Sequence, residues 1–308
     1  MKKLIILFFI SIIYCPGIIA QVLFLSYEKL GVIYKYNLNT KSEEKLFEGY
    51  QQSISPDGNN IAFTDTDEKT GGRFISIYNI NSKKITRLKS VPGDNSYFPR
   101  YSPDGKYLTF NHWTDNEWQI AIASVDDKSF KILTKNKVKN VSGFYSPTFT
   151  SDSKSIITHD MSNIFEFSLD GEVMNIFPID KIDPDKKVFM SSASTVWYDK
   201  NNFALIFDCE TENEFGGTYE NQNRIYRFDI AKNSLLKVSP DEYSATNPAV
   251  SFADGKIFFN AFTKDDVVKK TDGDMEYFEI SYSIYSTDIK GDKFSFLLKN
   301  GTSPSVNK

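Results

Sequence analysis

Two short patterns of apolar and polar positions recur along the chain. In the first, an apolar residue is followed four places later by Asp, Asn or Ser and then by an aliphatic residue. Its six copies span residues 33–38, 75–80, 120–125, 164–169, 225–230 and 284–289. In the second, a Pro-containing apolar run leads into a turn. Its six copies begin near residues 55, 98, 146, 195, 247 and 303, and those at 195 and 303 are degenerate and truncated, respectively.

These patterns predict strands rather than helices. Short apolar runs bounded by turn residues are typical of strands, and Asp-Gly after Pro is a tight-turn signal, clearest over residues 102–106. Each unit therefore supplies two hairpins, and four strands every 47–56 residues is the period of a propeller blade. We expect an all-β, six-bladed β-propeller of four-stranded antiparallel blades.

The order of the patterns predicts how the ring closes. The chain after residue 20 begins with a second-strand pattern at residues 22–25 and ends with a first-strand pattern at residues 303–306. The C-terminal strand should therefore join the N-terminal blade, which removes the exposed sheet edge of an open ring. This arrangement predicts one propeller domain over residues 21–308.

The first 20 residues have the layout of a signal peptide. Lys2 and Lys3 precede an uncharged apolar run over residues 4–13, and Ala20 marks a plausible cleavage point. We expect an exported protein, periplasmic or secreted, with no transmembrane span in the mature chain. The alternative is a lipoprotein attached through Cys15, although Tyr14 is bulky where such signals favour a small residue.

The net charge and the cysteine content exclude some classes of function. A formal net charge of −4 argues against a nucleic-acid partner, which requires a basic surface. Once the signal is removed, Cys209 is the one remaining cysteine, so an intramolecular disulfide and a cysteine-based zinc cluster are both excluded.

The repeated motif also carries a family resemblance. Ser-Pro-Asp-Gly-Lys at residues 102–106, followed by an aliphatic-x-Phe strand, resembles the WD40-like repeats of TolB-type six-bladed propellers. The resemblance covers essentially the whole mature chain and implies an exported propeller that binds other envelope proteins. TolB itself carries an extra N-terminal domain, for which we expect no room here.

Variable connections predict one functional face. The first-to-second and third-to-fourth turns are short, whereas long connections at residues 177–192, 209–223 and 261–282 should share the opposite face. Second strands end there in polar residues, and aromatic side chains occur in the long connections. The candidate binding residues are Asn111, His112, Trp113, His159, Asp160, Asp208, Glu210, Phe215, Tyr219, Tyr277 and Phe278.

We expect a non-catalytic platform for an envelope protein or peptide, with no catalytic residues, cofactor or resident metal. A metal held by His112 and His159, and calcium in the acidic connections around residues 272–274, remain alternatives. So does a glycan- or peptide-active enzyme using carboxylates among Asp65, Asp160 and Asp208. A propeller that binds a sugar or another small molecule is the third possibility.

Overall fold

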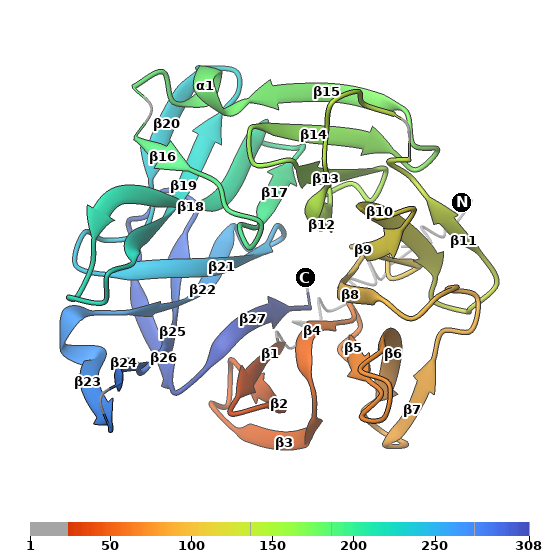
Figure 1. Ribbon diagram of the computed structural model, residues 1–308, viewed down its shortest axis with the longest axis horizontal. Helices are drawn as coiled ribbons and strands as arrows, with labels where there is room; N and C mark the ends of the chain where they lie inside the picture. Colours follow the sequence, from red (N-terminus) through yellow and green to blue (C-terminus); the bar gives the residue numbers. More distant parts are fainter. Residues whose placement is uncertain (1–23, 136, 186, 274, 308) are drawn as a thin grey trace, which may run out of the picture.

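A computed structural model describes residues 24–135, 137–185, 187–273 and 275–307. The predicted signal peptide lies outside these residues. Within them, six four-stranded antiparallel blades stand around a central axis (Figure 1), which confirms the predicted all-β, six-bladed propeller.

The blades follow one another along the sequence. Blade 1 comprises β4 (Tyr50–Ile54), β5 (Asn60–Thr66), β6 (Arg73–Asn79) and β7 (Lys84–Arg87). Blade 2 comprises β8 (Ser96–Tyr101), β9 (Tyr107–Thr114), β10 (Glu117–Ser124) and β11 (Phe130–Ile132). Blade 3 comprises β12 (Tyr145–Phe149), β13 (Ser155–His159), β14 (Asn163–Ser168) and β15 (Val173–Pro178).

Blade 4 comprises β17 (Val196–Asp199), β18 (Ala204–Glu214), β19 (Asn221–Asp229) and β20 (Ser234–Lys237). Blade 5 comprises β21 (Ser244–Ser251), β22 (Lys256–Phe262), β25 (Ser283–Asp288) and β26 (Ser295–Lys299). Blade 6 comprises β27 (Thr302–Val306), β1 (Phe24–Lys29), β2 (Val32–Asn37) and β3 (Glu43–Glu48).

The ring closes in blade 6 as the pattern order predicted. The C-terminal strand β27 pairs antiparallel with β1, so Leu25 lies opposite Val306. The backbone N–H of Phe24 also donates to the side-chain oxygen of Asn307 at 2.8 Å. Segments from the two ends of the described chain therefore complete one sheet.

Apolar side chains fill the space between neighbouring blades. In one such layer, Ile157 and Ile164 of blade 3 pack with Val196 and Phe207 of blade 4. All four side chains are fully buried. Burial of apolar surface between blades is the main force that holds a propeller together, because hydrogen bonds within a blade do not join it to the next.

Five inner strands carry a β-bulge at the same relative position. The bulged residue has a positive φ in each case: Gln51, Phe98, Ser146, Asn247 and Ser303. A bulge takes one backbone N–H out of the ladder of its own sheet. That N–H then needs an acceptor from elsewhere in the protein.

Three connections on one face contain structure that the repeat alone does not explain. The 178–196 connection holds α1 (Ile179–Ile182) and β16 (Val188–Phe189), which pairs with β18. The 262–283 connection holds the 3₁₀ turn η1 (Lys264–Asp266) and a hairpin of β23 (Val267–Asp272) and β24 (Met275–Ile280). The predicted long loop at 209–223 is mostly strand, because β18 and β19 extend beyond the blade and leave only residues 215–220 as a turn.

Helix content is very low across the residues that the structure describes. Their only α-helix, α1, has four residues, and none of their helices has the length and apolarity needed to cross a membrane.

Candidate functional site

The polar ends of the second strands hold the blades to one another. Four of these side chains accept the N–H of a bulged residue in the next blade. The pairs are Thr64 Oγ1 with Phe98 N at 3.1 Å, Asn111 Oδ1 with Ser146 N at 3.2 Å, Asp208 Oδ2 with Asn247 N at 3.1 Å, and Asn260 Oδ1 with Ser303 N at 3.0 Å. We call Thr64, Asn111, His159, Asp208 and Asn260 the inter-blade column. All five are 3% exposed or less, so they do not form an open polar mouth.

His159 contributes to the same column in the opposite sense. Its Nε2 lies 2.8 Å from the carbonyl oxygen of Ser194, and its Nδ1 accepts the backbone N–H of Met161 at 3.2 Å. These two contacts require a neutral ring with the proton on Nε2. Burial lowers the pKa of His159 to about 4, so the ring stays neutral near pH 7. Neither nitrogen is free for a metal.

Asp208 is a buried carboxylate that joins blade 4 to blade 5. Besides the Asn247 contact, its Oδ1 accepts the backbone N–H of Thr195 at 2.6 Å. Burial raises the pKa of Asp208 to about 6, although both hydrogen bonds favour the charged form and lower it. Desolvation is therefore the larger of the two effects.

The next positions along blades 2 and 3 also have local roles. His112 is buried, and its Nδ1 lies 2.8 Å from the hydroxyl of Ser96. Asp160 accepts the backbone N–H of Ser162 and organises the turn that follows β13. Trp113 is different, because 40% of it is exposed while its ring packs edge-on against Trp118 at 5.0 Å.

The carboxylates considered for catalysis are each engaged by their surroundings. Asp65 pairs with Arg87 at 3.0 Å, and Asp160 and Asp208 have the backbone contacts already given. Across the described ranges, no group of three or more His, Cys, Asp or Glu side chains is arranged to hold a metal ion. In that part of the chain, the structure therefore provides no ligand cluster for calcium or for a metal held by His112 and His159.

Aromatic residues from blades 4 and 5 meet beside the hairpin. Phe215 is buried and packs edge-on against Phe262 at 5.5 Å, so it supports the turn rather than facing solvent. Tyr219 is 79% exposed, and its ring lies 5.8 Å from that of Phe278. Tyr277 projects from the other face of the hairpin, because side chains alternate along β24.

A cleft of about 720 Å³ opens between the extended β18–β19 hairpin and η1. We call it the blade 4–5 cleft. Its lining residues are Asn213, Glu214, Phe215, Gln222, Asp241, Glu242, Thr263, Lys264 and Asp265. Phe215 is the one lining residue that the sequence selected.

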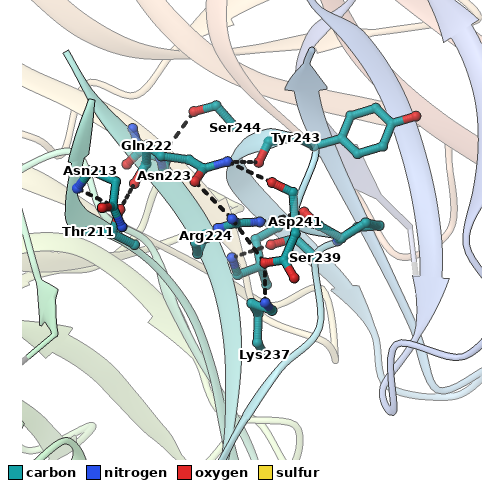
Figure 2. A network of polar contacts seen from close by, with 12 residues as sticks. Thr211, Asn213, Gln222, Asn223, Arg224, Lys237, Ser239, Asp241, Tyr243 and Ser244 are labelled. Atoms are coloured by element: carbon teal, nitrogen blue, oxygen red, sulfur yellow. Dashed lines mark hydrogen bonds and ion pairs between the residues drawn. The ribbon is translucent and has the colours of Figure 1, made fainter. Parts of the chain in front are cut away.

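Buried polar side chains fix one wall of this cleft (Figure 2). Gln222 donates to the carbonyl oxygens of Asp241 at 3.0 Å and Tyr243 at 2.9 Å. Arg224, which is 8% exposed, donates to Gln222 Oε1 at 2.8 Å and pairs with the Asp241 carboxylate at 3.1 Å. Lys237 pairs with the same carboxylate. The connection between β20 and β21 is therefore held at several points.

Two other hollows lie elsewhere on the propeller. One, of about 570 Å³, lies beside α1 and is lined by apolar side chains that include Met161, Phe189 and Met190. Glu210 lies next to it, opposite Phe189 in the β16–β18 pairing. Another, of about 610 Å³, lies on the tight-turn face and is lined in part by Pro56 and Pro103. Of these three hollows, only the blade 4–5 cleft is lined by a residue of the turn that carries Tyr219, whose exposed ring contacts the partly buried Phe278.

Sequence reasoning missed most of this cleft. Asn213, Gln222, Asp241 and Glu242 come from strands and connections that look unremarkable as sequence. The available signal was the unusual length of the chain between the second and third strands of blades 4 and 5. That length indicated the region correctly but could not indicate which side chains face a shared space.

The architecture is that of a six-bladed β-propeller, and comparisons with known proteins show a similarity to TolB proteins. No protein-family model matches the chain. The Tol-Pal system protein TolB of Francisella tularensis subsp. tularensis (strain WY96-3418) is 31% identical over 104 residues, which is 32% of this chain and 23% of the relative. TolB of Francisella tularensis subsp. mediasiatica (strain FSC147) matches equally well. The match thus spans about a quarter of these curated relatives.

Solved structures agree with this relationship at the level of the fold. TolB from Acinetobacter baumannii superposes with a TM-score of 0.62 at 13% identity, over 95% of this chain and 68% of that one. Putative TolB from Agrobacterium tumefaciens gives 0.60 at 13% identity, over 92% and 91%. A chain of the nidogen/laminin complex gives 0.62 at 8% identity, over 93% and 98%. The sequence match and these folds together support a TolB-like propeller.

Proposed function

We propose that this chain is an exported, non-catalytic propeller that binds an envelope protein or peptide through the loop-rich face of blades 4 and 5. The observation that carries the proposal is the blade 4–5 cleft together with Tyr219, whose exposed ring lies on the turn after Phe215 and contacts the partly buried ring of Phe278. Exposed aromatic side chains on a rigid scaffold are typical of protein-binding surfaces. The relatives that bear the Tol-Pal system name support a place in the cell envelope, and the predicted signal at residues 1–20 supports export.

Rigidity strengthens this proposal. The hairpin β18–β19 continues the sheet of blade 4, and Phe215 anchors its turn against blade 5. A surface that is already ordered loses less conformational entropy when a partner binds. The non-catalytic part of the proposal rests on the engaged state of Asp65, Asp160 and Asp208.

The test is a capture experiment with residues 21–308 as bait and envelope extract as the source of partners. A second bait carries Tyr219→Asn, which removes the exposed ring and keeps a residue that tolerates the positive φ of this position. The matched control is Phe203→Asn, because Phe203 is 58% exposed, has a positive φ and lies on the tight-turn face.

A third bait lacks the β23–β24 hairpin. The backbone N–H of Ser281 donates to the carbonyl of Asp266 at 3.0 Å, so a short Gly-Ser link can replace residues 267–280 without moving the blade. We expect a partner that is retained by the parent and by Phe203→Asn, and is lost with Tyr219→Asn or without the hairpin. Equal capture by all four baits, or by none, would contradict the proposed face.

A further inference from the structure

The walls of the blade 4–5 cleft carry an excess of negative charge. Four of its lining residues are carboxylates, whereas Lys264 supplies the one ammonium group. The Asp241 carboxylate is already paired with Arg224 and Lys237. Glu214, Glu242 and Asp265 are exposed, and in the described part of the chain none of them has a cationic group within ion-pair distance.

The chain places one of its own cations in this cleft. The ammonium of Lys264 lies over the ring of Phe215, 5.7 Å from the ring centroid. This is the geometry of a cation–π contact, which is attractive for an ammonium or guanidinium group. The contact shows that the cleft accommodates an ammonium group against the ring of Phe215.

The cleft keeps its shape without help from a ligand. Gln222 and Arg224 hold the β20–β21 connection, and Thr263 and Asp266 cap η1 through reciprocal hydrogen bonds. Glu214, Glu242 and Asp265 therefore lie on segments whose backbone is held in place around one space.

We propose that the blade 4–5 cleft binds a cationic, extended segment of the partner, in which lysine or arginine side chains enter the space between Glu214, Glu242 and Asp265. The proposal deepens the protein-binding function and rests on it. Charge complementarity selects the partner chemistry. The exposed ring of the neighbouring Tyr219 supplies an aromatic face for the cationic groups.

The probe is a fluorescein-labelled peptide of eight residues in which lysine and threonine alternate, and a glutamate–threonine peptide of equal length is its control. Binding to residues 21–308 is followed by fluorescence anisotropy at about 50 mM and about 200 mM NaCl, because screening weakens exposed charge pairs. The test variant is Glu214→Gln/Glu242→Gln/Asp265→Asn. The matched control is Glu44→Gln/Asp170→Asn/Asp292→Asn, which removes the same charge from exposed positions near the tight turns of blades 6, 3 and 5.

We expect the lysine peptide to bind more tightly at low salt, and the test triple to weaken it about tenfold, since three exposed charge pairs together contribute on that order. The control triple should leave the Kd unchanged. Lys264→Ala should tighten binding about threefold, because it removes the competing internal cation. A purely structural role for Lys264 would not produce a tighter complex.

Three results would overturn the proposal: equal effects of the two triples, equal binding of the two peptides, or a Lys264→Ala variant that binds no better than the parent. Failure of this proposal is separable from failure of the proposed function. A partner captured from envelope extract in a Tyr219-dependent manner, together with no peptide response, would leave the platform intact and remove the cationic segment. Peptide binding without a captured partner would contradict the proposed function, and the cleft would then bind cationic peptides without an envelope partner.

Discussion

Replacing Asp208 with asparagine should change how the free energy of unfolding depends on pH. The pKa of an aspartate in an unfolded chain is about 3.9, whereas burial raises that of Asp208 to about 6. Each pKa unit corresponds to about 1.4 kcal/mol, so the raised pKa of Asp208 changes the free energy of unfolding by about 3 kcal/mol over this pH window. Because the folded protein holds the proton more tightly, the stabilisation is fully present below about pH 4 and is lost as pH rises through about 6.

The parent protein alone will not reveal this effect. Burial lowers the pKa of His159 to about 4, and a histidine in an unfolded chain titrates at about 6.5. Its contribution to stability is therefore present above about pH 6.5 and is lost as pH falls towards about 4, with a magnitude of about 3 kcal/mol. The two buried groups titrate in the same window with opposite signs, so their contributions largely cancel.

Asp208→Asn isolates the carboxylate. The amide oxygen can still accept one backbone N–H, as Asn111 and Asn260 do at equivalent positions. Its NH₂ group then faces the other N–H, and a buried donor left without an acceptor costs about 1–3 kcal/mol. Near pH 7, loss of the buried charge offsets this cost. Near pH 4.5 nothing offsets it, so the variant should be less stable than the parent by about 2 kcal/mol.

The assay is urea unfolding of both proteins at several values between about pH 4.5 and pH 7.5, with the difference in unfolding free energy plotted against pH. Titration of all other groups cancels in that difference. Asp170→Asn is the control for the substitution itself, because the side chain of Asp170 is 93% exposed and the change removes only its exposed ion pair with Lys131. A difference for Asp208→Asn that does not change with pH, or that grows towards high pH, would refute the reasoning.

Two further predictions concern stability. Lys200→Met should destabilise the fold by about 3 kcal/mol, because it leaves the fully buried carboxylate of Glu166 without its cation at 2.7 Å; the double variant with Glu166→Gln should recover most of the loss in urea unfolding, and no recovery would count against the pair. Gly171→Ala should lower the free energy of unfolding by about 3 kcal/mol or more, because the added Cβ would lie 2.6 Å from the Leu133 carbonyl oxygen. Gly255→Ala should lower it by only about 1 kcal/mol, because the added Cβ meets no neighbouring atom and only the positive φ is unfavourable. Equal melting temperatures for the two alanine variants would contradict the close approach.

The sequence was sufficient for the blades because the propeller repeats a local rule. Strand, turn and strand are each specified within a few residues, as in Pro103-Asp104-Gly105, and the same rule applies around the ring. The closing strand could be predicted for the same reason: an incomplete set of strands at one end matches the complementary set at the other. The alignment of repeats also brought Asn111, His159 and Asp208 into one column correctly.

What that column does could not be predicted, because the function of a polar strand end depends on its neighbour in space. The bulges at Ser146 and Asn247 release backbone N–H groups towards the preceding blade, and no local pattern shows where an unpaired N–H will point. The extension of β18 and β19 was missed for a similar reason. The polar chain from Glu210 to Asn221 resembles a loop, and it is held as strand largely by contacts with β16 and blade 5.

The sequence by itself determined the fold class, the number of blades and the face that carries the inserted segments, since each follows from periodicity and from the lengths of connections. Only the tertiary structure decided which residues share the blade 4–5 cleft. Glu214, Asp241 and Asp265 are separated by more than 20 residues from one to the next, and they meet because packing of blade 4 against blade 5 brings three connections together. Burial and charge at such a site are properties of the assembled ring, which no single repeat contains.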